Sequence, residues 1–212
     1  MEYYAALATN IRTRAELGRW RWKWLLSAAG PTCAFIWDST DPVALDNGAY
    51  SYHLKGIPFD EEKFYRALER FGPRAEWIVV PDKVGDADAS MEMAEKWMPK
   101  LEGLPLLMCM QDGMELSDME HWLPKIDGIF LGGSTAYKLR GIKEFTKPIT
   151  DMGKRFHVGR VNTIKRIQLC QWHGVTSIDG SGVSRWTLWA ETINNWLLQD
   201  EQQQKLFGGI SD

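Results

Sequence analysis

Residues 105–113 have the sequence PLLMCMQDG, an apolar run that stops abruptly at glutamine, aspartate and glycine. A short apolar run that ends at turn-forming residues predicts a β-strand. The pattern recurs along the chain, and longer stretches with helical periodicity separate the runs. Strands that alternate with helices indicate right-handed crossovers and a parallel sheet covered by helices.

The expected strands cover residues 3–8, 33–37, 77–80, 105–110, 128–131, 156–158 and 176–178, with a weaker candidate at 43–45. Helical periodicity is present near residues 11–29, 60–71, 87–100, 116–123, 162–172 and 185–206. About eight strands in one unbroken domain favour a compact (β/α)8 barrel of the TIM type, although such barrels usually need ~250 residues. An open doubly wound α/β sheet is the alternative fold.

Composition predicts one soluble domain in the cytoplasm, or in the host cytoplasm if a phage encodes the protein. The 212 residues are 44% hydrophobic and 25% charged, enough for one sizeable core. We expect this single domain to span residues 1–212, with a frayed tail from about residue 200. The net charge of −3 restricts any nucleic-acid contact to a local patch. No signal peptide and no apolar run near the ~18 residues of a membrane span are found, so no membrane partner is expected.

Cysteine and histidine usage gives no sign of a metal site. The three cysteines, Cys33, Cys109 and Cys170, are far apart and odd in number, which disfavours a disulfide framework. Neither they nor the four histidines have the spacing of metal ligands. We therefore expect no zinc and no other cofactor.

Polar and glycine-bearing clusters follow the expected strands. They are DNGAY (46–50), PDK (81–83), QDG (111–113), GGS (132–134), HVGR (157–160) and DGSG (179–182). In a parallel barrel the carboxyl ends of all strands lie on one face, so these clusters are expected to converge on one pocket. Any one of them alone is an ordinary turn sequence. Their recurrence at the same phase favours a functional site.

The residue types in these clusters suggest chemistry at a glycosidic bond. If Asp46 and Asp179 face one pocket, one carboxylate can attack a carbon while the other moves a proton, as in retaining glycoside hydrolysis. Asp82 and Gln111 can recognise the polar edge of a flat heterocycle. Backbone N–H groups and open space are expected at Gly132–Gly133. An N-glycosidic bond with a purine-like leaving group fits this set.

Two basic clusters are candidates for phosphate binding. The first interleaves tryptophans with Arg12, Arg14, Arg19, Arg21 and Lys23. Its alternative is an amphipathic helix with a solvated basic face. The second flanks the expected strand at His157 and includes Arg160, Lys165 and Arg166. Arg160 is the member closest to the pocket and is either a phosphate or base-edge ligand or an ion-pair partner of a barrel carboxylate.

Two further residues have open roles. His157 is either a proton relay or a neutral histidine that is hydrogen-bonded inside the barrel. Tyr50, beside Asp46, either covers a bound base or plugs the mouth of the barrel.

The motifs LDNGAY, VVPDK, MQDG, IFLGGS, HVGRVNT and GVTSIDG, in that order, resemble the tRNA-guanine transglycosylase superfamily. They are most similar to its compact phage-type DNA-guanine transglycosylases, the DpdA family. The resemblance spans roughly residues 33–186. It implies a glycosyltransferase on a (β/α)8 barrel that exchanges guanine in nucleic acid for a 7-deazaguanine base through a covalent glycosyl-aspartate intermediate.

The resemblance also assigns roles to residues. The family's Asp-Ser-Gly-Gly-Phe motif is similar to residues 46–50, which implies that Asp46 is the general acid/base. The family's Gly-Val-Asp-x-Phe-Asp stretch is similar to residues 174–179, which implies that Asp179 is the nucleophile. The base would be held by Asp82, Gln111, Gly132 and Gly133, and the remaining substrate contacts would come from Asn47, Gly48, Tyr50, His157 and Arg160.

Departures from the family favour DNA over tRNA as the acceptor. The Cys-rich zinc-binding subdomain that follows the nucleophile in the tRNA enzymes is missing, and Gly180 stands where they have cysteine. A Val-Ser-Arg sequence replaces their Pro-Thr-Arg, and its Arg185 is a candidate nucleic-acid contact. The expected partners are DNA with a single-stranded or flipped-out guanine and a free base, 7-cyano-7-deazaguanine. Alternatives are an RNA-acting enzyme, a hydrolytic N-glycosidase and a non-catalytic nucleic-acid-binding barrel.

Overall fold

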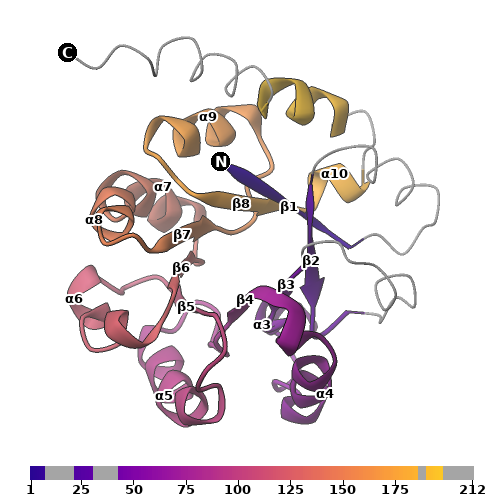
Figure 1. The fold of residues 1–212 in the computed structure, drawn as a ribbon, viewed down its shortest axis with the longest axis vertical. Coiled ribbons are helices and arrows are strands. Elements are labelled where there is room, and N and C mark those ends of the chain that lie inside the picture. The colour runs from indigo at the N-terminus through magenta and orange to yellow at the C-terminus, as the bar shows by residue number, and fades with distance from the viewer. Residues whose placement is uncertain (8–21, 31–42, 186–189, 198–212) are drawn as a thin grey trace.

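A computed structural model of the chain describes residues 1–7, 22–30, 43–185 and 190–197. Eight parallel strands pair in chain order and close into a barrel (Figure 1). They are β1 (Glu2–Ala6), β2 (Lys23–Ser27), β3 (Val43–Asp46), β4 (Ala75–Val79), β5 (Leu106–Met110), β6 (Gly128–Leu131), β7 (Arg155–Val158) and β8 (Ser177–Gly180). The fold is therefore the expected single-domain (β/α)8 barrel.

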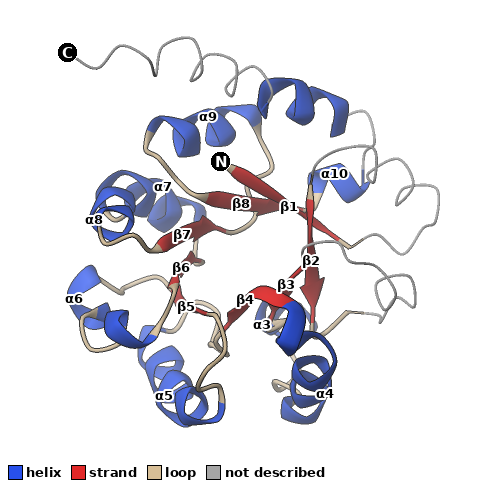
Figure 2. Cartoon of the chain, viewed as in Figure 1, coloured by secondary structure: helices blue, strands red, loops and turns tan. Residues whose placement is uncertain are grey.

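Helices form a ring outside the barrel (Figure 2). They are α3 (Ala49–Lys55), α4 (Glu61–Phe71), α5 (Ala87–Trp97), α6 (Leu116–Met119), α7 (Thr135–Glu144), α8 (Thr146–Asp151), α9 (Ile164–Trp172) and α10 (Gly182–Arg185), and residues 190–197 are also helical. Short 3-10 helices cover Gly72–Arg74, Met98–Lys100 and Leu123–Lys125. Side-chain caps start four of the helices, at Asp60, Asp86, Ser134 and Thr163.

Side chains alternate between the barrel interior and the layer under the helices. On β4, Trp77 and Val79 point inward, whereas Ile78 packs in the outer layer. The interior also holds Tyr4, Ala44, Leu107 and Cys109, with Leu25 and Phe130 against them. These side chains fill the middle of the barrel, so open space remains only at its two ends.

The amino ends of the strands are closed by charged groups. Lys23 forms ion pairs with Glu2 and Glu76, and Arg155 pairs with Glu2 as well. The Tyr4 hydroxyl donates to Glu76 Oε2 at 2.6 Å. Lys23 therefore lies at the end of β2 opposite to the carboxyl ends of the strands, away from the expected pocket.

The helix expected near residues 11–29 is wrong at residues 23–27. Residues 23–27 form β2 and not part of a helix, while the expected strand at 33–37 lies outside the described residues. In β2, Trp24 and Leu26 face the outer layer and Leu25 faces the interior. So short an apolar segment fits either periodicity, and pairing with β1 and β3 decides in favour of a strand.

Three helices were not expected. The helix α3 starts directly after the turn at residues 46–48, and α7 and α8 fill the connection from β6 to β7. Gly141 weakens the helical signal of α7, yet a Cβ there would lie 3.0 Å from both Leu131 methyl groups. The glycine thus permits close packing of α7 on β6. Within the described part of the chain no helix is long and apolar enough to cross a membrane.

Candidate active site

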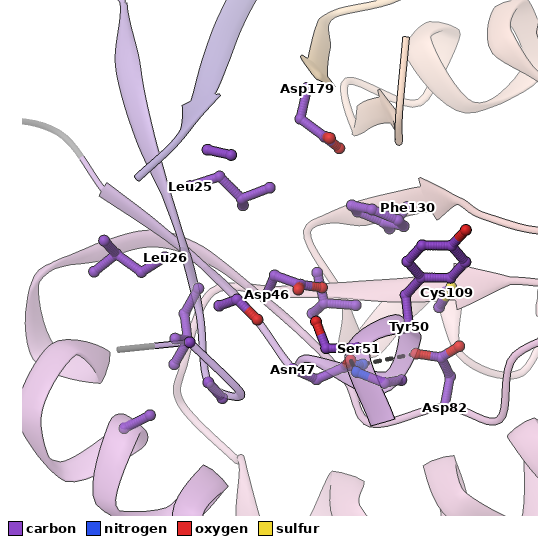
Figure 3. Close-up of a pocket in the computed structure, with 18 of the residues that line it drawn as sticks. Leu25, Leu26, Asp46, Asn47, Tyr50, Ser51, Asp82, Cys109, Phe130 and Asp179 are labelled. Atoms are coloured by element: carbon purple, nitrogen blue, oxygen red, sulfur yellow. Dashed lines mark hydrogen bonds between the residues drawn. The ribbon is translucent and has the colours of Figure 1, made fainter. Parts of the chain in front are cut away.

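A cavity of about 710 Å³ opens at the carboxyl ends of the strands (Figure 3). Of the residues predicted to form the site, it is lined by Asp46, Asn47, Tyr50, Asp82, Gln111, Gly132, Gly133, Arg160 and Asp179. Tyr50 lies in the first turn of α3, and the other residues come from the ends of β3 and β8 or from the turns directly after β3 to β7. The prediction that the clusters converge on one pocket is confirmed.

Asp46 is the last residue of β3 and lies in register with Ser27 of β2. Burial of its carboxyl, with added repulsion from Asp179 and Asp82, raises the pKa of Asp46 to about 7. The backbone N–H of Gly48 and the hydroxyl of Ser27 act in the opposite direction. Asp46 can therefore both hold and release a proton near neutral pH.

Asp179 lies on β8, with its carboxylate held at both oxygens. Oδ1 accepts a hydrogen bond from the backbone N–H of Arg160 at 3.1 Å, and Oδ2 lies 3.0 Å from His157 Nε2. Figure 3 shows Asp179 and Asp46 on different sides of the same cavity. The residue is 6% exposed, so this fixed carboxylate faces the cavity with little contact to bulk water.

His157 forms a hydrogen bond with Asp179 from inside the barrel. Its ring is fully buried and packs on Phe130 and Trp77 at centroid distances of 4.9 and 4.6 Å. Burial lowers the pKa of His157, against the opposing effect of Asp179, so the ring is neutral. A neutral ring has one N–H, and the carboxylate requires it on Nε2. Nδ1 then accepts from the Ser177 hydroxyl at 2.9 Å.

The direct substrate contact predicted for His157 is therefore corrected, because the ring has no exposed surface. It reaches the cavity only through Asp179. The alternative of a histidine hydrogen-bonded inside the barrel is the one that the structure shows.

Asp82 is held by two side-chain amides. Asn47 Nδ2 donates to Oδ1 at 2.7 Å, and Gln111 Nε2 donates to Oδ2 at 2.6 Å. Burial raises the pKa of Asp82, and these two amides act against that rise. Each carboxylate oxygen has two lone pairs, so capacity remains for N–H groups of a ligand. Gly85 N–H donates to Gln111 Oε1 at 3.1 Å and fixes the orientation of that amide.

The two glycines after β6 keep this part of the cavity open. A Cβ on Gly132 would lie 2.9 Å from Gln111 Nε2 and 3.0 Å from Cys109 Sγ. Gly133 has a φ of 75°, and a Cβ there would meet Asp112 Oδ2 at 2.5 Å. A side chain at Gly132 would therefore displace Gln111, which holds Asp82, and one at Gly133 would displace Asp112.

Arg160 and Tyr50 contact each other across the cavity. Arg160 follows β7, adopts the left-handed conformation at φ 57° and donates from Nη2 to the Gly133 carbonyl at 2.8 Å. Its guanidinium carbon lies 4.0 Å from the centroid of the Tyr50 ring on α3. Because β3 and β7 lie on opposite sides of the barrel, this cation–π contact spans the cavity. The ion pair considered as an alternative for Arg160 is not present among the described residues.

Gly48 does not line the cavity, which corrects its predicted role in substrate contact. It caps α3 with a φ of 83°, and a Cβ there would lie 2.7 Å from Ala29. Its missing side chain permits close packing on Ala29.

Sequence reasoning missed the apolar wall of the cavity, made by Leu25, Val79, Cys109 and Phe130. The sequence did contain a signal for this wall. Each of these residues stands about two positions before the polar end of its strand, and side chains two apart on a strand point to the same face. It also missed Asp112, whose Oδ2 accepts from Ser134 N–H at 2.6 Å and ties two turns together.

The predicted nucleic-acid contacts divide into three groups. Arg12, Arg14, Arg19 and Arg21 lie outside the described residues. Lys23, as noted, is at the opposite end of the barrel. On the side of the cavity, Arg166 and the exposed Lys165 lie on α9, and α10 ends at Arg185.

Among the residues that the structure describes, no group of histidine, cysteine and carboxylate side chains is placed to hold a metal ion. Cys109 and Cys170 are buried free thiols. No protein-family model matches the chain, and no curated protein is similar to it.

Proposed function

We propose that the protein is a DNA-guanine transglycosylase that exchanges guanine for a 7-deazaguanine base through a glycosyl-aspartate intermediate on Asp179. The observation that carries the proposal is the pair of acidic side chains in one cavity with different environments. Asp46 has a pKa of about 7, and Asp179 accepts two N–H hydrogen bonds. This difference between the two carboxyl groups suits a pair in which one transfers a proton and the other acts as the nucleophile.

In the first half-reaction, a carboxylate oxygen of Asp179 attacks C1′ of the target nucleotide. The bond from C1′ to the guanine nitrogen breaks, and its electron pair goes to the departing base. The protonated carboxyl of Asp46 gives that base a proton, so neutral guanine leaves. The sugar is then bound to Asp179 as an ester.

In the second half-reaction, the Asp46 carboxylate takes the ring N–H proton of the incoming deazaguanine. The freed nitrogen attacks C1′, and the ester bond to Asp179 breaks with return of its electron pair to the carboxylate. Both aspartates end in their starting states, so the exchange needs no other reactant.

The group around Asp82 supports recognition of a guanine-like edge. Guanine and 7-deazaguanine share a ring N–H and an exocyclic amine, which the free lone pairs of Asp82 can accept. The N–H of Gly133 has no acceptor within the described part of the structure and can donate to the carbonyl oxygen of the base. The missing side chains at Gly132 and Gly133 leave space for a planar ring.

The Arg160–Tyr50 contact supports exchange over hydrolysis. The intermediate must meet an incoming base before water, so the site has to exclude solvent. A guanidinium and a phenol ring that meet across the cavity at 4.0 Å limit access to its interior.

The remaining alternatives make different predictions. A hydrolytic N-glycosidase would release guanine and leave an abasic site, and an RNA enzyme would use RNA in place of DNA. A barrel that only binds nucleic acid would form no covalent adduct. Against this last alternative stands a carboxyl with a pKa of about 7 inside the cavity, because such shifts are concentrated at catalytic sites.

The test is incubation of the protein with DNA or RNA and labelled 7-cyano-7-deazaguanine, followed by mass analysis of the nucleosides. The proposal expects label in DNA, release of guanine and a trapped adduct on Asp179. Abasic DNA without label would establish hydrolysis instead, and label in RNA alone would correct the acceptor. Binding of DNA without any of these products would refute a catalytic role.

A further inference from the structure

Three basic residues lie close together where α7, α9 and the turn after β7 meet. Lys138 comes from α7, Arg166 from α9 and Arg160 from that turn. Together with Thr135, Gly159 and the apolar side chains of Leu139, Ile142, Val158 and Val161, they line a cavity of about 10 Å³. The three basic residues are therefore neighbours around one small, mainly apolar cavity.

The three cations have no carboxylate partner among the described residues. Lys138 is only 6% exposed, and its ammonium donates to the Gly159 carbonyl at 2.7 Å. The Arg166 guanidinium lies 3.4 Å from Thr135 Oγ1. By contrast, Arg140 on the same helix as Lys138 pairs with Glu115 and Glu144.

Placing these charges together is unfavourable. Burial first, and then the positive charges of Arg160 and Arg166, lower the pKa of Lys138 to about 8, while Asp179 acts in the opposite direction. A buried charge without a counterion is costly, and a bound anion removes that cost. Ammonium and guanidinium groups that lie close together match the non-bridging oxygens of a phosphate.

The cluster is connected to the proposed nucleophile through two consecutive residues. Lys138 binds the carbonyl of Gly159, and the N–H of the next residue, Arg160, donates to Asp179. In a nucleotide chain, the phosphates on either side of a sugar are the anionic groups closest to its C1′. A sugar placed for attack by Asp179 therefore has its two phosphates close to the residues that surround Asp179.

We propose that Lys138, Arg160 and Arg166 bind one backbone phosphate next to the exchanged nucleotide. This inference rests on the proposed function, because it assumes a nucleic-acid strand whose sugar reaches Asp179. The competing explanation is that Lys138 only ties α7 to the turn after β7. The two explanations differ in what a neutral phosphate would do.

The experiment measures binding of a single-stranded, guanine-containing oligonucleotide at several salt concentrations. The variants are Lys138→Met and Arg166→Met, and Lys147→Met is the matched control because Lys147 pairs with Asp151 on the surface of α8. Loss of one phosphate contact should lower the slope of log K against log salt by about 0.7. Affinity at low salt should fall about tenfold in both variants and stay unchanged in the control.

A second experiment changes the phosphate in place of the protein and identifies which phosphate is bound. Oligonucleotides with one uncharged methylphosphonate, on the 5′ or the 3′ side of the target guanine, are compared with wild type and Arg166→Met. At one of the two linkages the methylphosphonate should weaken binding of the oligonucleotide to the wild-type protein about tenfold. The same methylphosphonate should leave binding to Arg166→Met nearly unchanged. Fully additive effects at both linkages would overturn the proposal, even if Lys138→Met failed to fold.

The outcomes separate this inference from the proposed function. If wild type exchanges guanine but Arg166→Met has the wild-type salt slope and the methylphosphonate effects are additive, only the phosphate site is wrong. If the coupling is found but no protein form exchanges a base, the site binds nucleic acid and the proposed reaction is wrong.

Discussion

The Nε2 atom of His157 lies 3.0 Å from Oδ2 of Asp179, beneath the cavity and out of contact with solvent. Ser177 lies 2.9 Å from the other ring nitrogen, and Arg155 Nη1 lies 3.4 Å from the Ser177 hydroxyl. Since arginine only donates, the hydrogen bonds run in one direction, from Arg155 through Ser177 and His157 to Asp179. The orientation of the carboxylate is thus set from inside the barrel.

Replacement of His157 by phenylalanine should slow formation of the proposed covalent adduct about a hundredfold, because Asp179, the proposed nucleophile, loses one of its two fixed contacts. The Kd for DNA should change little, since the ring does not reach the cavity. Single-turnover adduct formation and oligonucleotide binding measure the two effects. His157→Gln, which keeps an N–H donor, should recover part of the rate. Equal losses in both variants would indicate that the ring acts only through packing.

The reaction should depend on protonation of Asp46. In the proposed reaction the free protein must carry that proton to release guanine, so kcat/KM for DNA should fall about tenfold per pH unit above the pKa of about 7. The pH profile of initial exchange rates is the measurement. Asp46→Asn should be nearly inactive at every pH and still bind the free base. A profile that rises through pH 7 would contradict the role of Asp46 as the proton donor.

The same pKa has a consequence for stability. Folding raises the pKa of Asp46 from 3.8 to about 7, so the folded state binds the proton more tightly than the unfolded state. The associated stabilisation is present below pH 3.8 and is lost as the pH rises through 7. Asp46→Asn should therefore raise Tm more at pH 8 than at pH 5. An equal change in Tm at both pH values would show that the carboxyl is not displaced from its ordinary pKa.

Base recognition should depend on the charge of Asp82. Asp82→Asn replaces an acceptor by a donor on one oxygen, so binding of 7-cyano-7-deazaguanine should weaken about a hundredfold. Calorimetric titration with the free base measures this loss. Asp151→Asn removes a surface carboxylate of α8 and should bind as wild type does. Unchanged affinity of Asp82→Asn for the free base would show that the base binds in another part of the cavity.

A methyl group at Gly132 should have a similar local effect. In Gly132→Ala the new Cβ would lie 2.9 Å from Gln111 Nε2, so the amide that holds Asp82 must shift. We expect weaker base binding, by about tenfold or more, with little change in Tm. Gly72→Ala is the control, because its nearest neighbour is a side-chain atom at 3.9 Å. If both variants bound the base equally well, the Gly132 region would not face the ligand.

The sequence predicted the strand ends better than the elements between them. Asp46, Asp82, Gln111 and Asp179 were found because a polar residue after an apolar run marks the functional face of a parallel barrel. The strand at residues 23–27 was missed because five residues such as KWLLS do not distinguish helix from strand without their neighbours.

The sequence also did not predict how deep in the barrel each side chain lies. His157 and Arg160 are three residues apart, yet one is buried under Asp179 and the other crosses the cavity. Nothing in the sequence indicated that Lys138 is buried near the cavity, because a lysine in an amphipathic helix is normally solvated. Only the packing of α7 on the turn after β7 brings it beside Arg160 and Arg166.

Asp179 lies on the strand that closes the barrel, in register with Tyr4 of β1. A nascent chain therefore carries Asp46, Asp82 and Gln111 early but gains the proposed nucleophile only when the eighth strand docks beside the first. The proposed reaction thus requires the complete barrel, including the pairing of these two strands. A loosened pairing of β1 and β8 would abolish that reaction before the rest of the barrel unfolded.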